Sequence, residues 1–159
     1  TAPGKGTTFV ISVPVVTPSD AAEEKVEGLS SLSGLRVLIV DDDFEVRDFM
    51  PKLLPGHIAD TAESGAEALE KMRGAAYDLV ITDWVMSGMS GLELAEKVKQ
   101  KSPDTTVVLI TGWEFKGTPA DDSDAVDLVL SKPFDSIKLN RALQQAVEPR
   151  NRAGALHNT

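Results

Sequence analysis

Short apolar runs recur along the middle of the chain, at a spacing typical of strands separated by helices. They occupy residues 37–40, 77–82, 106–110 and 128–130. Each run is rich in β-branched residues and too short for a helix, which favours strands. The runs are largely apolar rather than strictly alternating, so we expect strands that are buried on both faces, as in a parallel sheet.

Helix signals lie between these runs. Ser64-Gly-Ala-Glu67 and Ser90-Gly-Leu-Glu93 are capping boxes that precede apolar positions at helical spacing. A last helix is predicted from near Asp135, with Leu139, Leu143 and Ala146 on one stripe. Strands and helices that alternate over about 115 residues predict an α/β fold, with a doubly wound parallel sheet and helices on both faces.

Three segments give weaker signals. Residues 44–54 should form the first helix, but Pro51 removes a backbone donor at a cost of about 3 kcal/mol, so we expect this helix to be short or kinked. Residues 57–62 predict a weak strand that includes His57, for which a strand or loop position is more plausible than a role as phosphoacceptor. Residues 115–124 make a poor helix on propensity.

The flanking segments differ in composition from the central part. Residues 7–16 predict a strand, which Pro14 restricts to an edge or a terminus. Residues 17–33 predict a linker, residues 34–148 one compact domain, and residues 149–159 a C-terminal tail. The chain does not begin with Met, and we expect it to be part of a longer protein.

Composition narrows the functional classes. The chain of 159 residues contains no Cys and two His, so neither a thiolate zinc site nor an imidazole metal centre is expected, and any metal should be held by oxygen. A formal net charge of −9 argues against nucleic acid as a partner. No apolar run is long enough to cross a membrane, so we expect a soluble, cytoplasmic domain without membrane contact.

Polar residues follow the predicted strands where each strand ends. In an open parallel sheet, these carboxyl ends form the crevice in which ligands bind. In the order of the predicted strands, which begin with the apolar run at residues 37–40, these polar residues are Asp41, Asp42 and Asp43, then Asp83, then Thr111 and finally Lys132. Carboxylates that converge to about 5 Å repel one another by about 3 kcal/mol per pair at an effective dielectric constant near 20. Such a cluster needs a hard divalent cation with oxygen ligands, Mg²⁺ above all.

A carboxylate beside Mg²⁺ can act as a nucleophile toward phosphorus, because the metal and a lysine neutralise the charge on the phosphoryl oxygens. Lys132 supplies the positive charge and Thr111 a hydroxyl group. This order of Asp-Asp, Asp, Thr and Lys-Pro at successive strand ends resembles the response-regulator receiver family over residues 35–148. The resemblance implies a five-stranded, flavodoxin-like receiver fold with the strand order 2-1-3-4-5.

The resemblance also implies a role for each site residue. Asp42, Asp83 and the backbone carbonyl of Val85 would bind Mg²⁺ directly, and Asp41 would bind it through water. Asp83 would be the phosphoacceptor for a phosphohistidine donor, while Thr111 and Lys132 would contact the phosphoryl oxygens. The peptide bond between Lys132 and Pro133 would be cis. Asp43 would start a helix rather than bind the metal or the phosphoryl group.

The chain departs from the family pattern at several positions. Ser87 stands where Pro is usual in the loop after the phosphoacceptor, which we expect to loosen this loop without changing the chemistry. Val129 replaces the aromatic switch residue of many receivers, so the route by which the signal leaves the domain is open. Val85 and Trp113 are bulky residues that would flank the path of hydrolytic water, which predicts slow loss of the phosphoryl group.

Residues 4–14 resemble the final strand of a histidine-kinase ATPase domain, which implies that residues 1–16 are a remnant of that domain. The parent would then be a hybrid sensor histidine kinase, of a kind that can be membrane-anchored, with this receiver at its C-terminal end. The chain lacks the ATP-binding boxes and the phosphorylated histidine, so we expect a phosphoacceptor rather than a kinase. Its partners would be a histidine-kinase dimerisation domain or a histidine phosphotransfer protein.

Two other functions stay open. Asp41-Asp42-Asp43 also fits the Asp-x-Asp motif of haloacid-dehalogenase-type phosphatases, with Asp41 as nucleophile, although Glu45 stands where those enzymes have Thr or Val. The chain could also be a degenerate receiver that accepts no phosphoryl group and serves as a docking module. The intact set of site residues argues against this last function.

Overall fold

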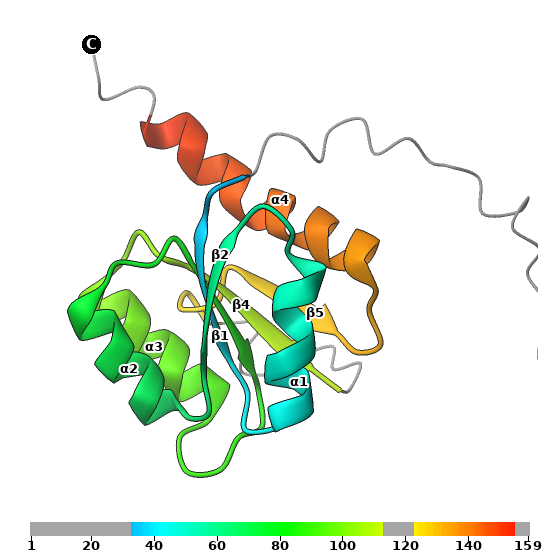
Figure 1. Cartoon of the computed structure of the whole chain (residues 1–159). Coiled ribbons are helices and arrows are strands. Elements are labelled where there is room, and N and C mark those ends of the chain that lie inside the picture. Colours follow the sequence, from blue (N-terminus) through cyan, green and yellow to red (C-terminus); the bar gives the residue numbers. More distant parts are fainter. Residues whose placement is uncertain (1–32, 113–122, 155–159) are drawn as a thin grey trace, which may run out of the picture.

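Five parallel strands form a single sheet in the order β2-β1-β3-β4-β5 (Figure 1). The computed structural model describes residues 33–112 and 123–154. The strands are β1 (Arg36–Val40), β2 (Ile58–Ala62), β3 (Leu79–Asp83), β4 (Thr106–Thr111) and β5 (Leu128–Ser131). This architecture confirms the predicted α/β fold and its strand order.

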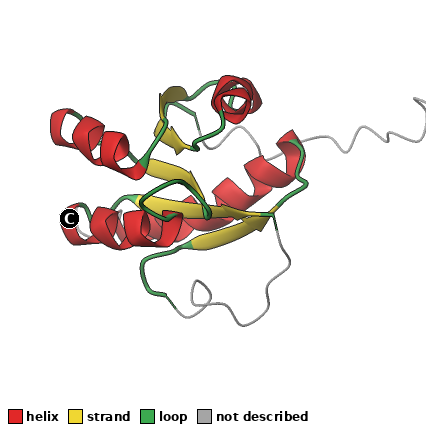
Figure 2. Ribbon diagram, turned by 90° about the horizontal axis from the view of Figure 1, so that it is seen from below, coloured by secondary structure: helices red, strands yellow, loops and turns green. Residues whose placement is uncertain are grey.

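Helices cover both faces of the sheet. They are α1 (Phe44–Phe49), the 3₁₀-helix η2 (Met50–Leu53), α2 (Gly65–Gly74), α3 (Gly91–Lys101) and α4 (Ser136–Gly154). Helices α2 and α3 lie on one face, and α1 and α4 on the other, which Figure 2 shows from the end of the sheet. Each helical connection returns the chain to the end of the sheet at which the strands begin. The carboxyl ends of all five strands therefore lie on one side of the molecule.

Alternate residues of the strands supply two separate cores. Leu38, Val40 and Val80 pack with α2 and α3, together with Leu94 and other buried residues of that face. On the opposite face, the inward residues of the strands pack against η2 and α4; they are Val37, Ile39, Leu79, Ile81, Val108 and Ile110. The inner strands are therefore buried on both sides, as their apolar runs predict.

The first helix is interrupted at the position that Pro51 predicts. Helix α1 ends at Phe49 and continues as η2, in which Pro51 occupies an early position where its missing N–H is tolerated. Asp43 caps α1, because its side chain accepts a hydrogen bond from the N–H of Glu45 at 2.8 Å. This helix start is the role expected for Asp43.

The serine caps of the next two helices are also confirmed. Ser64 accepts a hydrogen bond from the N–H of Glu67, and Ser90 forms a complete capping box with Glu93. Glu67 differs from the expected box, because its carboxylate accepts from the N–H of Glu63 and not from that of Ser64.

The ends of the domain differ in part from expectation. Helix α4 continues to Gly154, so the predicted boundary at residue 148 falls inside a helix and the tail assigned to residues 149–159 is helical as far as residue 154. The predicted terminal strand, the linker up to residue 32 and most of the weak helix at residues 115–124 lie outside the described residues. Within the part of the chain that the structure describes, no helix is long and apolar enough to span a membrane.

Gly91 allows α3 to begin directly against the end of β3. A Cβ atom at this position would lie 2.1 Å from the backbone oxygen of Asp83 and 2.8 Å from Cδ1 of Leu109. We expect Gly91→Ala to lower the free energy of unfolding by about 1–3 kcal/mol, because backbone atoms must move to admit the methyl group. Urea unfolding followed by circular dichroism measures this change.

Gly74→Ala is the matched control. Gly74 ends α2, and a Cβ atom there would have no neighbour within 4 Å. Alanine should leave stability unchanged or raise it by up to about 1 kcal/mol through its helix propensity. Equal unfolding midpoints for the Gly91→Ala variant and the unmutated protein would contradict the close approach of α3 to Asp83.

Candidate functional site

The residues singled out in the sequence lie at the carboxyl ends of four neighbouring strands, β1, β3, β4 and β5. Asp41 to Asp43 follow β1, Asp83 ends β3, and Thr111 ends β4. Lys132 directly follows β5, where Thr111 is paired with Ser131 across the two strands. These ends form the lower edge of the sheet in Figure 1. The strand order therefore brings together residues from most of the length of the domain.

Lys132 is the central cation of this cluster. Its Nζ donates a hydrogen bond to Oδ1 of Asp83 at 2.6 Å and lies 3.8 Å from Oδ2 of Asp41. Its backbone N–H donates to the carbonyl of Thr111 at 2.7 Å, and the Lys132–Pro133 peptide bond is cis, as expected. One amine thus faces two carboxylates that belong to different strands.

Asp41 is the most buried carboxylate of the site, with 4% of its surface exposed. Its Oδ1 accepts from the backbone N–H of Asp43 at 2.9 Å. Burial raises the pKa of Asp41, and the nearby carboxylate of Asp83 adds to this rise, whereas the bond from Asp43 and the charge of Lys132 oppose it. Burial is the largest of these causes, so the pKa of Asp41 is raised mainly because its charged form is removed from water.

Asp42 is exposed and faces the loop between β3 and α3. Its Oδ2 accepts two hydrogen bonds from Ser87, one from the backbone N–H and one from Oγ, both at 3.0 Å. These two bonds lower the pKa of Asp42. Serine supplies two donors here where proline would supply none, so these bonds oppose the loosening of the loop that the sequence predicts.

Val85 follows Asp83 on the same loop. Its N–H donates to Oδ2 of Asp83 at 3.1 Å, while its side chain is 79% exposed. Both oxygens of Asp83 are therefore held by donors, one by Val85 and one by Lys132. Trp113, the other bulky residue expected beside the site, lies outside the described residues, and Val129 is partly buried within β5.

Arg47 is a site residue that the sequence analysis missed. Its Nη1 donates to the backbone carbonyl of Asp41 at 2.8 Å, and its guanidinium lies over the ring of Phe44. Arg47 is one helical turn beyond Asp43, so it can reach back over the start of α1. That spacing is the sequence signal for this contact, although it does not reveal which carbonyl is bound.

The donor set suits a magnesium ion held by few protein ligands. Among the described residues, no three acidic or histidine side chains form a ready-made metal cage. Mg²⁺ commonly takes only one or two carboxylates and keeps several waters. Asp42 and Asp83 could provide these carboxylates. Burial disfavours the charged form of the neighbouring Asp41 and raises its pKa, so a cation close to it would stabilise its carboxylate.

The comparisons with known proteins assign the family. The model of the response regulator receiver domain matches residues 37–144. The chain belongs to the response regulator receiver family. This receiver is 35% identical over 102 residues to the response regulator receiver protein CpdR of Brucella abortus (strain 2308), an alignment that covers 62% of this chain and 85% of CpdR.

Solved structures agree with this assignment. The receiver aligns with the response regulator protein TrrA of Thermotoga maritima, crystallised in complex with Mg²⁺-BeF, at a TM-score of 0.64 and 35% identity. That alignment covers 70% of this chain and 98% of TrrA. NtrX from Brucella abortus aligns at a TM-score of 0.72 and 26% identity over 79% of this chain and 29% of NtrX.

Several relatives are much longer than the matched segment. The receiver spans 26% of the transcriptional regulatory protein ZraR of Klebsiella oxytoca at 33% identity. It spans 9% of the sensor protein EvgS of Escherichia coli (strain K12) at 38% identity over 105 residues, which are 63% of this chain. The same domain thus occurs in proteins of different size and kind.

The buried charge of Asp41 has a measurable effect on stability. Because the folded-state pKa lies above the ordinary value of 3.8, stability falls as pH rises from that value through the raised pKa, and the full penalty is present at neutral pH. We therefore expect Asp41→Asn to raise the urea midpoint in EDTA at neutral pH. The gain should disappear at about pH 3.5, where the carboxyl is protonated.

Asp48→Asn is the control for this measurement. Asp48 forms an exposed ion pair with Lys52, so its loss should change the midpoint little at either pH. A midpoint for Asp41→Asn equal to or below that of the unmutated protein at neutral pH would contradict the destabilising effect of the buried carboxylate.

Proposed function

We propose that this receiver accepts a phosphoryl group from phosphohistidine onto Asp83 in a magnesium-dependent reaction. The contact between Lys132 Nζ and Asp83 Oδ1, at 2.6 Å, carries the proposal. It joins residues 49 positions apart at the carboxyl ends of two strands, in the order typical of the family. A lysine at this distance supports a phosphoacceptor, because it can stabilise negative charge on a phosphoryl group.

The reaction needs a carboxylate nucleophile in a polar site. An oxygen of Asp83 forms a bond to phosphorus as the bond from phosphorus to the donor imidazole nitrogen breaks, and the imidazole then takes up a proton. Lys132 would orient the transferred group, and the hydroxyl of the buried Thr111 would contact one of its oxygens. Neither side chain needs to transfer a proton.

Magnesium would be held by Asp42, Asp83 and the backbone carbonyl of Val85, with Asp41 acting through water. When bound, the ion supplies positive charge that lowers the repulsion between the carboxylates and the incoming phosphoryl group. Support comes from the donor chemistry of this site and from TrrA, a relative whose structure contains Mg²⁺-BeF. For the residues of this chain, the ligand set stays a proposal.

A groove beside the site suits a helical partner. It lies between α1 and the segment after β5, and its lining includes Val46, Phe49, Lys132 and Phe134. Phe49 is 56% exposed, so an apolar surface adjoins the phosphoacceptor. This combination supports docking of a histidine-kinase dimerisation domain or a histidine phosphotransfer protein.

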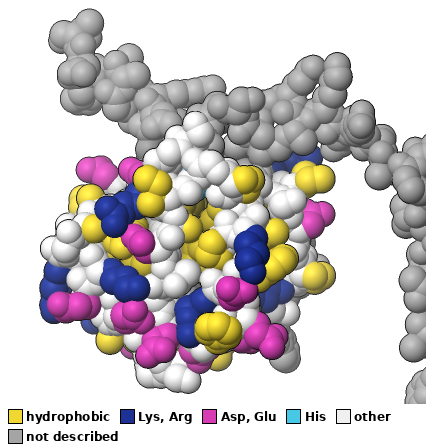
Figure 3. All heavy atoms as spheres, in the orientation of Figure 1, with side chains coloured by type: hydrophobic (Ala, Val, Ile, Leu, Met, Phe, Trp, Pro, Cys, Tyr) yellow, Lys and Arg dark blue, Asp and Glu magenta, His cyan; other side chains and the backbone are white. Residues whose placement is uncertain are grey.

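The face in Figure 3 carries acidic and basic side chains side by side, so no purely basic patch covers it. This mixture is consistent with a protein partner and with the formal charge of −9.

The parent protein is proposed to be a hybrid sensor histidine kinase. Support comes from the sequence of residues 4–14 and from the match to EvgS, a sensor protein of which the aligned segment is a small part. In that case residues 1–16 would belong to the ATPase domain, residues 17–33 would be the linker, and the receiver would be cytoplasmic.

The phosphatase alternative finds less support. Its Asp-x-Asp pattern needs the side chain of Asp43 at the reacting centre, but this side chain caps α1. The docking-module alternative is decided by phosphorylation itself, since a degenerate receiver takes up no phosphoryl group.

Phosphorylation is tested by intact-mass spectrometry after incubation with acetyl phosphate and Mg²⁺. We expect a mass increase of about 80 Da that is absent from Asp83→Asn and from samples with EDTA. The exposed carboxylate of Asp48 provides the control, since Asp48→Asn should be modified normally. No adduct in the unmutated protein would favour the docking module, and an adduct that persists in Asp83→Asn but is lost in Asp41→Asn would favour the phosphatase.

The lifetime of the phosphoryl group tests the role of Val85. Its exposed side chain adjoins Asp83, so it should restrict the approach of water to phosphorus. We expect Val85→Ala to shorten the half-life about fivefold, or about 1 kcal/mol of activation free energy. Loss of the adduct over time measures this rate. Ile58→Ala, at an exposed position on β2, should change nothing, and an unchanged half-life in Val85→Ala would refute the shielding role.

A further inference from the structure

A direct link joins the loop after β1 to the loop after β3. Asp42 lies on the first loop and Ser87 on the second, 45 positions later in the chain. Both donors of Ser87 bind the same oxygen of Asp42, Oδ2, at 3.0 Å. Neither described bond from Ser87 involves the other oxygen, Oδ1, so Ser87 holds one side of the carboxylate without occupying the other.

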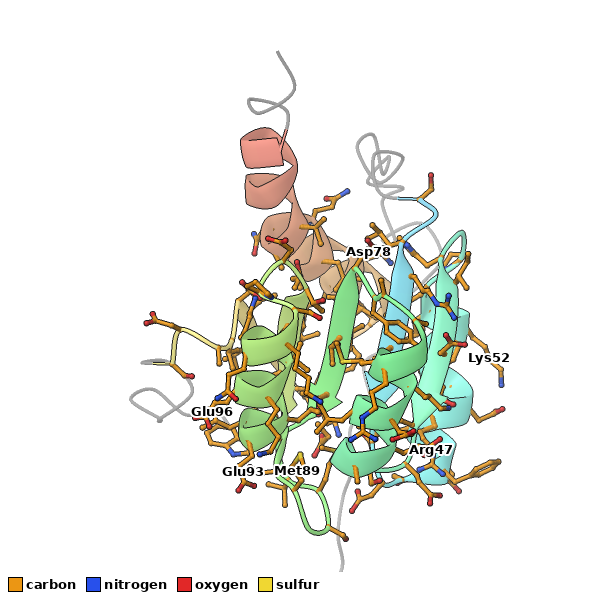
Figure 4. The ribbon with its side chains drawn as sticks, turned by 90° about the vertical axis from the view of Figure 1, so that its left-hand side faces the viewer. Arg47, Lys52, Asp78, Met89, Glu93 and Glu96 are labelled. Atoms are coloured by element: carbon orange, nitrogen blue, oxygen red, sulfur yellow. The ribbon has the colours of Figure 1, made fainter. Side chains whose placement is uncertain are left out.

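The loop that carries Ser87 is itself well anchored. Met86 is 8% exposed, and the hydroxyl of Thr82 donates to its sulfur. Met89 packs against Gly65 at the start of α2, and Figure 4 shows it at the lower end of the two helices α2 and α3. Ser87 therefore lies between two anchored residues, Met86 and Met89. Its donors stay in place, so the hydrogen bonds break if the side chain of Asp42 rotates away.

We propose that Ser87 is a positioning residue that holds the carboxylate of Asp42 in the orientation that receives the divalent cation. The inference rests on the proposed function, because it assumes that Asp42 is a magnesium ligand. Carboxylates that bind metals are commonly oriented by hydrogen bonds to their second oxygen, and removal of such a partner costs about 10–100-fold in metal affinity. Ser87 thus takes part in the chemistry of the site, contrary to the expectation from sequence.

The same two bonds also connect the loops before any metal arrives. A carboxylate that is already oriented loses less side-chain freedom when it binds an ion. The alternative is that Ser87 competes with the metal for Asp42. A competitor would have to release Asp42 on binding, whereas a positioning residue keeps Oδ2 and leaves Oδ1 to the ion, so the two roles change the affinity in opposite directions.

The link itself is tested without metal. In EDTA, the backbone amide of Ser87 should exchange with solvent deuterium slowly, and Asp42→Ala should speed this exchange about tenfold or more. Two-dimensional NMR of the full chain resolves the amide. Fast exchange of the Ser87 amide in the unmutated protein would overturn the inference, irrespective of any result with Mg²⁺.

The consequence for the metal is tested by titration with Mg²⁺ followed by tryptophan fluorescence, since Trp84 adjoins Asp83. Ser87→Ala should raise the dissociation constant about tenfold. Ser87→Thr keeps the hydroxyl and should stay within about twofold of the unmutated protein. Ser102→Ala, at the far end of α3, removes a hydroxyl away from the site and should have no effect.

The outcomes separate the two proposals. Unchanged or tighter Mg²⁺ binding by Ser87→Ala, with normal binding by the unmutated protein, would overturn the positioning role alone and leave the proposed function intact. Failure of the unmutated protein to bind Mg²⁺ would overturn both. Urea midpoints for each variant show whether the fold is retained, and the exchange experiment decides the case if Ser87→Ala does not fold.

Discussion

The site depends on the balance of charge at the carboxyl ends of the strands. Three carboxylates, those of Asp41, Asp42 and Asp83, follow two adjacent strands, and Lys132 is the cation that contacts two of them. At an effective dielectric constant near 20, like charges a few ångströms apart cost several kcal/mol unless they are compensated. The fold concentrates this cost in a small region, where burial of Asp41 and the nearby carboxylate of Asp83 both raise the pKa of Asp41.

Apolar packing elsewhere in the domain makes this arrangement possible. The inner strands contribute alternate residues to two cores, so their register is fixed from both faces and a slip of one residue would reverse every side chain. Register in turn fixes where each strand ends, and hence where Asp83 and Thr111 lie. Gly91 adds a local condition, because only a residue without Cβ lets α3 start against the carbonyl of Asp83.

The elements that depend on local sequence could be predicted, whereas contacts between loops could not. Apolar runs located the strands, Ser90 located a helix start, and Pro51 located the end of α1, since each acts through its own backbone or near neighbours. The bonds from Ser87 to Asp42 depend on where two loops lie in space. The bond from Arg47 to the carbonyl of Asp41 is local, but the spacing does not reveal which carbonyl is bound. From the sequence, Ser87 is noticed only because it lacks the proline ring that is usual in the family. The two hydrogen-bond donors that it adds become apparent only in the structure.

The two held oxygens of Asp83 indicate how a signal would leave the site without an aromatic residue at position 129. Oδ1 accepts from Lys132, and Oδ2 accepts from the N–H of Val85. If Asp83 is phosphorylated as proposed, the oxygen bonded to phosphorus becomes the bridging oxygen of a mixed anhydride and the other becomes a neutral carbonyl oxygen. Both hydrogen bonds would then weaken, and their donors could turn to the phosphoryl oxygens. Loss at Oδ2 would move the loop that Ser87 ties to Asp42, and loss at Oδ1 would move the turn that leads into α4. The first change would start at the backbone N–H of Val85 and the second at the side chain of Lys132. Neither needs a rotating ring, so Val129 is compatible with a response to the proposed phosphorylation.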